Sequence, residues 1–436
     1  MHPIKQMIER RATGSKEGIW SVCSANRYVI EAAMRRCGAK GLPVLVEATA
    51  NQVNQDGGYT GMKPADFRRF VKEIATKAGF PEKDIILGGD HLGPLTWAGE
   101  DEESAMRKAE VLVASYVEAG YTKIHIDTSM RLGSDDANAP LSPAVVAKRG
   151  ARLAAVCERS YAALKAREPD APHPVYVVGS EVPVPGGTKE DEGIVVTTPE
   201  DFRETLTLFC EEFEKAGASA SDIIAVVVQP GVEFSNDSVH EYDRVAAQVL
   251  CAEKQKFPNV VFEGHSTDYQ TKYALRQMVE DGIAILKVGP ALTFALREGL
   301  FALSRIEKEQ FAGREAQQAF FPETLDHAMA EKPGNWEKYY HGDAYIQKLQ
   351  RAYGFSDRCR YYLTDPAVDA SMEKLLENLT AEVPAPALVS QYLPEQYRRV
   401  REEGLACTAQ ELLLDKVGTL MDDYVFAVCE SGQPGY

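Results

Sequence analysis

Several common signatures are missing from this sequence. None of its eight cysteines forms a CxxC pair, and residues 1–18 lack the apolar core of a signal peptide. No stretch reaches about 18 uninterrupted apolar residues, so we expect no membrane span. Together these absences predict a reduced, cytoplasmic protein whose free thiols are mostly buried.

Positive charge is also scarce compared with negative charge. The chain of 436 residues has 48 Lys and Arg against 65 Asp and Glu, which gives a formal net charge of −17. Such a surface repels phosphate backbones and argues against nucleic acid as a partner. A small phosphorylated substrate stays open, because local cations or a bound metal can override the net charge.

The sequence does have a repeating pattern over roughly its first 300 residues. Short apolar runs end in small or polar residues, and a longer segment with helical periodicity follows each run. The eight runs are "GIWSVCSA" (18–25), "PVLVEATA" (43–50), "IILGGDH" (85–91), "KIHIDTS" (123–129), "VYVVGSEV" (175–182), "IIAVVVQPG" (223–231), "VVFEGHSTD" (260–268) and "IAILKVGPA" (283–291). Eight alternating strands and helices imply parallel pairing and predict an α/β fold, a closed (β/α)₈ TIM barrel.

An open, doubly wound sheet is the alternative fold. It is disfavoured because no GxGxxG opens the first helix and because polar residues end nearly every strand, not only those at one switch point. Helices are expected over 64–80, 101–121 and 198–218, each of which has acidic residues near its start and a glycine near its end.

This alternation of apolar runs and helical segments ends after residue 310. Residues 311–436 have few β-branched runs and several helical ones, such as 394–405 and 409–430. We therefore expect a barrel over 1–310 and a helical extension over 311–436 that packs on the barrel.

The candidate functional residues stand at the strand ends, which converge at one mouth of such a barrel. His91 and Glu181 end the third and fifth runs, and His265 lies in the seventh. Two imidazoles and a carboxylate suit Zn²⁺, Mn²⁺ or another divalent ion. No HExxH motif supports this metal site, and each histidine could instead bond a neighbouring carbonyl group.

Two aspartates near the predicted metal site are candidates for proton transfer. Asp90 precedes His91, and because side chains alternate along a strand it need not bind the metal but can act as a general base or orient a hydroxyl. A turn or helix-capping role is the alternative for Asp90. Asp127 shares a strand face with His125 and lies nearer the mouth, whereas the deeper His125 is interpreted as structural.

The second run ends in Glu47 and leads into the loop "ATANQVNQDGGYTG" (48–61). Glu47 is a further candidate for catalysis. Asn51 and Gln52 could bond sugar hydroxyls, although an ordinary polar loop explains them as well. Gln229 and Asp268, at the ends of the sixth and seventh runs, are further candidates for substrate binding.

Lys287 in the eighth run has two interpretations. It could form a Schiff base with a carbonyl substrate, or it could be the ion-pair partner of Glu263 or another acid inside the barrel. After it, Gly289 and Thr293 begin a predicted helix, whose N–H groups could hold an anion such as phosphate. A plain strand-to-helix turn is the alternative.

Whole motifs along the chain resemble one known family, GatZ/KbaZ/AgaZ. The resemblance rests on "SVCSAN", "EATANQVNQDGGYTGM", "ILGGDHLGP", "KIHIDTSM", "GSEVPVPGG", "VVVQPGVEF", "HSTDYQT", "LKVGPALTFALRE", "DRCRYY" (357–362) and "SQYLP" (390–394), and so covers nearly the whole chain. This family belongs with the class II D-tagatose-1,6-bisphosphate aldolases of galactitol and N-acetylgalactosamine catabolism. Related proteins are similar to metal-dependent 4-epimerases that act on tagaturonate or on fructose and tagatose.

The resemblance implies a metal-dependent retro-aldol site for a ketose or ketose phosphate, with zinc as the first expectation and manganese or nickel as alternatives. In class II aldolases the Asp–His pair after the third strand has its histidine on zinc and its aspartate on substrate protons, and Asp90-His91 matches that pair. The outcome would be C3–C4 cleavage or C4 epimerisation. The sequence departs from the catalytic aldolases at Gln229, where they have a ligand histidine.

The second functional alternative is a non-catalytic role. Members of the family are usually described as an accessory subunit that supports a separate, smaller catalytic aldolase subunit, so such a partner is expected, and a homo-oligomer is a further alternative. Some members have been named tagatose-6-phosphate kinases. The sequence has no GxxxxGK[ST] motif, which argues against kinase activity.

Overall fold

The computed structural model describes residues 1–180 and 194–429. Eight parallel strands close into a barrel in the order β1-β10-β9-β6-β5-β4-β3-β2. Their bounds are β1 (Ile19–Val22), β2 (Val44–Thr49), β3 (Ile85–Leu92), β4 (Lys123–Ile126), β5 (Val175–Val178), β6 (Ile223–Val228), β9 (Val261–Gly264) and β10 (Ile283–Val288). The predicted TIM barrel is therefore confirmed. A two-stranded hairpin, β7 (Glu233–Phe234) and β8 (Val239–His240), follows β6 and was not predicted.

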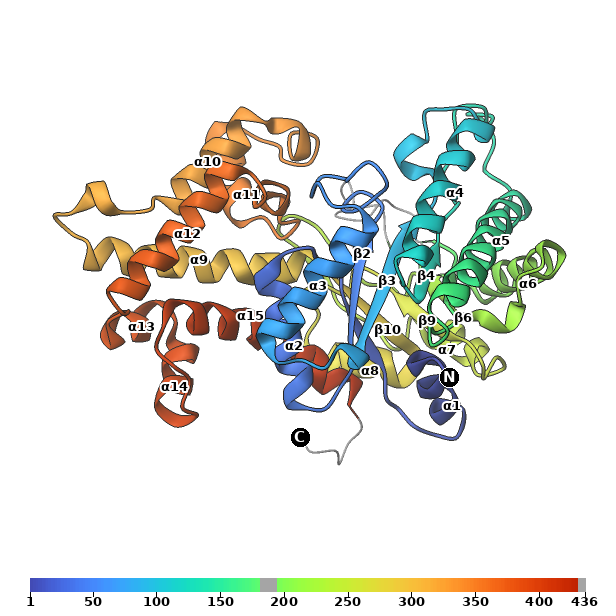
Figure 1. Cartoon of the computed structure of the whole chain (residues 1–436), viewed down its shortest axis with the longest axis horizontal. Coiled ribbons are helices and arrows are strands. Elements are labelled where there is room, and N and C mark those ends of the chain that lie inside the picture. The colour runs from blue at the N-terminus through green and yellow to red at the C-terminus, as the bar shows by residue number, and fades with distance from the viewer. Residues whose placement is uncertain (181–193, 430–436) are drawn as a thin grey trace.

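Helices surround the barrel and continue beyond it (Figure 1). The α-helices are α1 (Pro3–Ala12), α2 (Arg27–Ala39), α3 (Pro64–Ala78), α4 (Glu102–Glu118), α5 (Pro143–Arg167), α6 (Pro199–Ala216), α7 (Gln248–Lys254), α8 (Lys272–Asp281), α9 (Pro290–Gln310), α10 (Phe321–Glu331), α11 (Ala344–Tyr353), α12 (Pro366–Ala381), α13 (Pro386–Tyr392), α14 (Pro394–Glu402) and α15 (Ala409–Val428). Short 3₁₀ turns are η1 (Glu82–Asp84), η2 (Pro94–Trp97), η3 (Ala220–Asp222), η4 (Glu315–Gln317), η5 (Pro333–Asn335) and η6 (Arg358–Tyr362).

The capping residues explain why the predicted helices form where they do. The side chains of Asp101 and Thr198 accept hydrogen bonds from backbone N–H groups at the starts of α4 and α6. Gly79 and Gly217 end α3 and α6 in the left-handed conformation that glycine adopts at low cost. Burial of one apolar face against the strands then holds each helix on the barrel.

The C-terminal helices pack on the barrel, as expected for the extension. Helix α15 lies against α2, α8 and α9. Helices α10, α12 and α13 also contact α9, while α11 contacts α10 and α14 contacts α13 and α15 (Figure 1). The division into 1–310 and 311–436 as separate units stays a prediction. In the parts of the chain that the structure describes, no helix has the length and apolarity needed to cross a membrane.

The barrel interior is layered. At its lower end, Ile4, Met7 and Ile8 of α1 pack against apolar strand side chains such as Leu45 and Ile285. Because parallel strands of a barrel alternate inward and outward side chains, the next inward positions form a separate layer above this apolar plug. That layer is charged, and it lies directly beneath the mouth where the strands end.

Candidate active site

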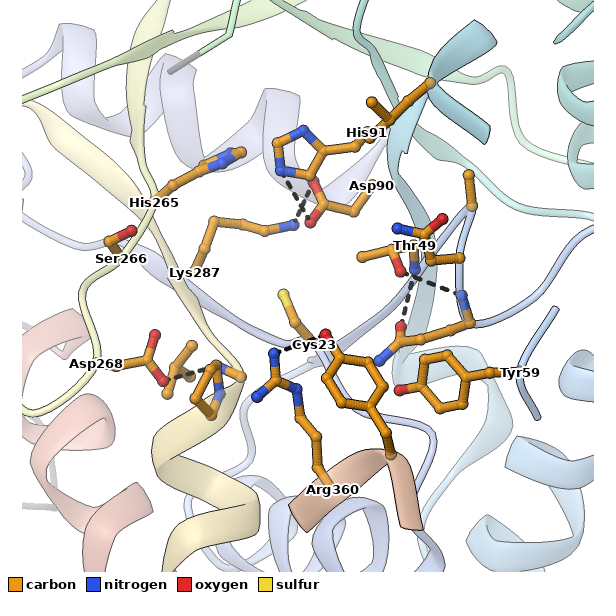
Figure 2. A pocket seen from close by; sticks show the side chains of 18 of the residues that line it. Cys23, Thr49, Tyr59, Asp90, His91, His265, Ser266, Asp268, Lys287 and Arg360 are labelled. Atoms are coloured by element: carbon orange, nitrogen blue, oxygen red, sulfur yellow. Dashed lines mark hydrogen bonds and ion pairs between the residues drawn. The ribbon is translucent and has the colours of Figure 1, made fainter. Parts of the chain in front are cut away.

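The end of β3 departs from regular strand geometry at Asp90 and His91. The register between β3 and β4 shifts between Gly89 and Leu92, and His91 has a φ of 48°, in the left-handed region that residues other than glycine rarely adopt. A regular strand would direct two successive side chains to opposite faces. Here both side chains join one cluster at the mouth, and Figure 2 shows them side by side. The irregular strand end thus places Asp90 beside His91, and its role in proton transfer stays a prediction.

Two histidines of the cluster are each bonded to a carboxylate behind them. Nδ1 of His91 lies 3.0 Å from Oδ2 of Asp127, and Nε2 of His265 lies 3.0 Å from Oε1 of Glu263. Because a carboxylate oxygen accepts, each of these ring nitrogens carries the proton. In the neutral form of each ring, the other nitrogen has a free lone pair. Burial alone would lower the pKa of His91, but Asp90 and then Asp127 outweigh it and raise that pKa, so a metal at His91 has to displace a proton.

The third histidine, His125 on β4, is held by the backbone. Its Nε2 lies 2.9 Å from the carbonyl oxygen of Gly179, so Nε2 donates. Its Nδ1 accepts the N–H of His91 at 3.1 Å and faces a carboxylate oxygen of Asp90 at 2.9 Å. Nδ1 of His125 faces the shared space, but the N–H of His91 already uses its lone pair. In their neutral forms, only His91 and His265 therefore keep a free lone-pair nitrogen there.

These residues form a donor set compatible with a divalent metal. One ligand atom each of Asp90, His91, His125 and His265 lies within 4.8 Å of the others, and all four residues are buried. Three imidazoles and one carboxylate suit the four-coordinate geometry of zinc. Burial lowers the pKa of His265 to about 4, which keeps that ring neutral as a metal ligand must be.

Below the cluster lies the charged layer of the barrel. Lys123 is completely buried and bonds Glu47 at 2.8 and 3.0 Å and Glu263 at 2.6 Å. Lys287 bonds Glu47 as well, and its Nζ lies 3.0 Å from Oδ1 of Asp90. Alternating charges thus connect the floor of the barrel to the cluster at the mouth.

This layer fixes the charge states at the mouth. Burial alone would raise the pKa of Asp90, but Lys287 and then His91 outweigh it and hold that pKa well below its ordinary value. Burial alone would lower the pKa of Lys287, but Asp90 and the other acidic groups around it hold that pKa well above its ordinary value. Asp90 is therefore a carboxylate and Lys287 an ammonium at neutral pH.

A cavity of about 180 Å³ opens over the cluster. Its walls include Asp90, His91, His265 and Lys287 on the barrel side, and Arg360 of η6 on the opposite side (Figure 2). Polar side chains at the mouth of the barrel form one wall of the cavity, and the C-terminal helices form the opposite wall. A small polar molecule in this space would touch both.

The model of one protein family matches residues 4–429, described as D-tagatose-1,6-bisphosphate aldolase subunit GatZ/KbaZ-like. The chain belongs to this family. A crystal structure described as a probable tagatose 6 phosphate kinase from Sinorhizobium meliloti 1021 is 46% identical, with a TM-score of 0.85 over 94% of this chain and 100% of that chain. This GatZ/KbaZ-like chain and the Sinorhizobium protein thus share family and fold over nearly their full lengths.

Two more distant matches are also similar in part. A fructose-bisphosphate aldolase from Campylobacter jejuni is 14% identical with a TM-score of 0.44, over 86% of this chain and 92% of that chain. An aldolase described as fructose-1,6-biphosphate aldolase from Coccidioides immitis is 16% identical with a TM-score of 0.42, over 85% of this chain and 96% of that chain. At these scores they add nothing to the assignment of this GatZ/KbaZ-like chain.

The residues predicted from sequence divide into those at the cavity and those away from it. Besides His91 and His265, those that line it are Asn51, Gln52, Asp90, Asp268, Lys287 and Gly289. Glu181 lies outside the described residues. The roles of all of these in this GatZ/KbaZ-like chain stay predictions, and the barrel places them around one cavity.

Four predicted residues do not line this cavity, and the reasons are identifiable for each: Glu47, Asp127, Gln229 and, at the start of α9, Thr293. Glu47 has no exposed surface and belongs to the charged layer beneath, and Asp127 is placed behind His91 by their hydrogen bond. Oε1 of Gln229 accepts the N–H groups of Gly231 and Val232 at 2.8 and 3.0 Å, which closes a local turn. Each of these polar groups is therefore used inside the protein.

The predicted anion site at the start of α9 is also occupied by the protein itself. Oδ1 of Asp268 accepts the N–H groups of Gly289 and Ala291 at 3.0 and 2.8 Å. Thr293 donates its hydroxyl to Asp357 at 2.6 Å and lines a neighbouring cavity. The backbone donors that a phosphate would need are already satisfied.

Sequence reasoning missed two residues that the geometry singles out. His125 was interpreted as structural because it lies deeper than Asp127, yet it belongs to the buried cluster. Arg360 lies in the motif "DRCRYY", which carried family resemblance but no role, and it lines the cavity. No spacing rule connects position 360 with a strand end, so this placement could come only from the fold.

Proposed function

We propose that this chain carries out metal-dependent aldol-type chemistry at the C3–C4 bond of a ketose, seen as C3–C4 cleavage or as C4 epimerisation. The observation that carries the proposal is that His91 and His265 each donate one ring N–H to a carboxylate, which leaves their other nitrogens in one buried cluster with His125 and Asp90. His91 and His265, with His125 beside them, would hold the ion, with zinc preferred, and Asp90 is left free to act on substrate protons. When bound, a divalent ion there supplies Lewis-acid polarisation of the ketose oxygens.

Asp90 is the residue best placed to move a proton. It lines the cavity, it is ionised, and the ammonium of Lys287 lies 3.0 Å from one of its oxygens. As a general base it takes the proton of the C4 hydroxyl, the C4–O bond becomes a carbonyl, and the C3–C4 bonding electrons move to the C2 carbonyl. Return of those electrons to the other face of the aldehyde gives the C4 epimer, whereas loss of the aldehyde gives cleavage.

Lys287 stabilises negative charge in this scheme and forms no Schiff base. A Schiff-base lysine needs a neutral amine, but Asp90 and Glu47 hold Lys287 as an ammonium. Its position on the cavity wall places a permanent positive charge where oxygen charge develops during bond cleavage. Asp127 and Glu263 position their histidines and touch no substrate.

The residue at the sixth strand supports a second candidate function. Gln229 closes a turn and directs no ligand atom to the cluster, so the histidine found there in catalytic aldolases has no counterpart at this position. The chain could then act as an accessory subunit beside a smaller catalytic aldolase. His125 weighs against this alternative, because it supplies the third imidazole from β4 instead.

The test uses the purified full chain loaded separately with Zn²⁺, Mn²⁺ or Ni²⁺. We expect cleavage of tagatose 1,6-bisphosphate, or interconversion of fructose and tagatose or of their 6-phosphates, and loss of it in Asp90→Asn. Absence of every reaction with every metal, together with a gain of activity by a co-expressed smaller aldolase subunit, would instead establish the accessory role.

A further inference from the structure

We propose that Arg360 recognises a terminal anionic group, a phosphate or a carboxylate, on the ketose in the cavity. This inference rests on the proposed function only in taking a ketose as the occupant. It concerns the substrate class, because fructose, fructose 6-phosphate and fructuronate differ in that terminal group alone.

Arg360 reaches the cavity from the C-terminal helices and not from the barrel. It belongs to η6, and Figure 2 shows its guanidinium directed into the space beneath Asp90 and Lys287. It lines both the main cavity and the neighbouring one of about 270 Å³. A ketose bound near His91 would therefore have its far end toward Arg360.

Two of the five N–H groups of Arg360 have no acceptor among the described residues. Nη1 donates to the carbonyl oxygens of Ser356 and Asp357 at 2.5 and 2.9 Å, and Nη2 donates once, to the hydroxyl of Tyr361 at 2.9 Å. The Nε–H and one Nη2–H remain. Such a pair of donors matches the two oxygens of a carboxylate or phosphate.

Arg360 also differs from the neighbouring cations in its charge balance. Lys287 is paired with Glu47 and Asp90, and Arg27 in the adjoining cavity is paired with Asp369 and Glu373. Among the described residues, no carboxylate oxygen lies within 4.0 Å of the Arg360 guanidinium. Asp357 and Asp268 act on this guanidinium only through space, so at the cavity wall its two remaining donors stay available to an external anion.

The other anion-binding element of the cavity is closed. The N–H groups of Gly289 and Ala291 at the start of α9 already donate to Asp268. An anionic end of the substrate is thus left with the guanidinium as its strongest available donor.

The turn that holds Arg360 is built in place by buried polar contacts. Asp357, which precedes η6, has a φ of 45° and accepts the hydroxyl of Thr293 at 2.6 Å. Nε of Arg297 lies 3.6 Å from Oδ1 of the same carboxylate. Helix α9, which starts at the barrel mouth, therefore fixes the orientation of η6, and this reserves the Arg360 side chain for the cavity.

The test compares binding of fructose, fructose 6-phosphate and fructuronate to the zinc-loaded full chain by isothermal titration calorimetry. Arg360→Gln should weaken binding of the anionic sugar by at least about tenfold, because a charge-assisted pair of hydrogen bonds is lost, while the affinity for fructose stays within about twofold. Arg360→Lys keeps the positive charge but loses the planar pair of donors, so its affinity for the anionic sugar should lie between those of the wild type and Arg360→Gln. The sugar whose affinity falls identifies the anion: fructose 6-phosphate indicates a phosphate and fructuronate a carboxylate.

The matched control is Arg314→Gln, which also removes one positive charge but from an exposed pair with Glu382 in the same C-terminal helices. It should change none of the three affinities. The proposal is overturned if Arg360→Gln leaves both anionic sugars unchanged, if it weakens fructose by the same factor, or if the wild type binds neither anionic sugar.

The binding readout separates this inference from the proposed function. A chain without aldolase or epimerase activity that still loses anionic sugars in Arg360→Gln would refute the function and keep Arg360 as the recognition residue. An active chain whose KM for the phosphorylated substrate is unaffected in Arg360→Gln would support the proposed function and refute the role of Arg360. In an active enzyme we expect the KM to rise by a larger factor than kcat falls.

Discussion

Nδ1 of His91 lies 3.0 Å from the carboxylate of Asp127, two positions that stand 36 residues apart on neighbouring strands. This contact fixes the tautomer of His91 and turns its other nitrogen toward the buried cluster. The same arrangement recurs between His265 and Glu263. Carboxylates behind histidines raise ligand basicity and hold the ring in place in metal sites.

We therefore predict that Asp127→Ala lowers zinc affinity by about 10- to 100-fold. His91→Ala should lower it further, because a ligand itself is removed. Titration of the metal-free chain with zinc against a competing chelator measures both. Asp326→Ala is the control, since Asp326 pairs with Arg351 at 2.8 Å and lies outside both groups of potential metal ligands. Equal zinc affinity in Asp127→Ala and the wild type would contradict the assigned role.

A second prediction concerns the buried lysine beneath the cluster. Lys287→Met leaves Glu47 and Asp90 without a shared cation, so we expect a loss of about 3–5 kcal/mol in the free energy of unfolding. Adding Glu47→Gln should recover part of that loss, because the remaining negative charge is reduced. Denaturant titration measures both variants. Lys287→Met with wild-type stability would show that the charged layer is dispensable.

The glycine pair before Asp90 gives a third prediction. Gly88 is the register partner of Glu47 on β2, and a Cβ at Gly88 would meet the side chain of Glu47. Gly88→Ala should therefore destabilise the protein by about 1–3 kcal/mol through overpacking. Gly99→Ala is the control, because nothing lies within 4 Å of a Cβ there. Similar melting temperatures for both variants would contradict the close approach.

A fourth prediction follows from Asp268, whose pKa burial raises from 3.8 to about 6. Because the folded state binds this proton more tightly, its stabilising contribution is complete below about pH 4 and is lost as pH rises through 6. Asp268→Asn keeps the Oδ1 acceptor and cannot ionise. The unfolding free energy of the wild type should therefore fall relative to Asp268→Asn between pH 4 and pH 7, by about 3 kcal/mol at most. Chemical denaturation over this range measures it, and parallel pH profiles would refute it.

The fold could be predicted from the sequence because its evidence is repetitive. Each apolar run is long enough to be a strand buried on both faces, and each is followed by a segment with helical spacing. His91 and His265 were found for the same reason, since strand ends of a barrel must converge. Local geometry was less accessible. The irregularity of β3 at Asp90 depends on its pairing with β4, and no feature of "GGDHL" announces it.

Residues whose roles depend on contacts far apart in the chain were interpreted less well. The depth of His125 favours a structural role, and its contact with the backbone N–H of His91 across the irregular end of β3 could not be foreseen from the sequence. Thr293 was expected to bind an anion, but its partner, Asp357, stands 64 residues later. Lys287 shows the intermediate case: its ion-pair role was one of two interpretations, and its partners, Glu47 and Asp90, were not identified.

The closure of the barrel has a consequence for the order in which the chain can fold during synthesis. Strand β1 completes its pairing only with β10, and the N–H of Gly18, just before β1, donates to the carbonyl oxygen of Val428 at the end of α15. A ribosome that makes the chain from its N-terminus therefore releases the first strand more than 400 residues before that last contact can form. The edge of β1 stays unpaired until β10 has been made, and the apolar faces of α2 and α8 stay uncovered until α15 has been made. During synthesis the chain therefore exposes surface of the kind that holding chaperones bind.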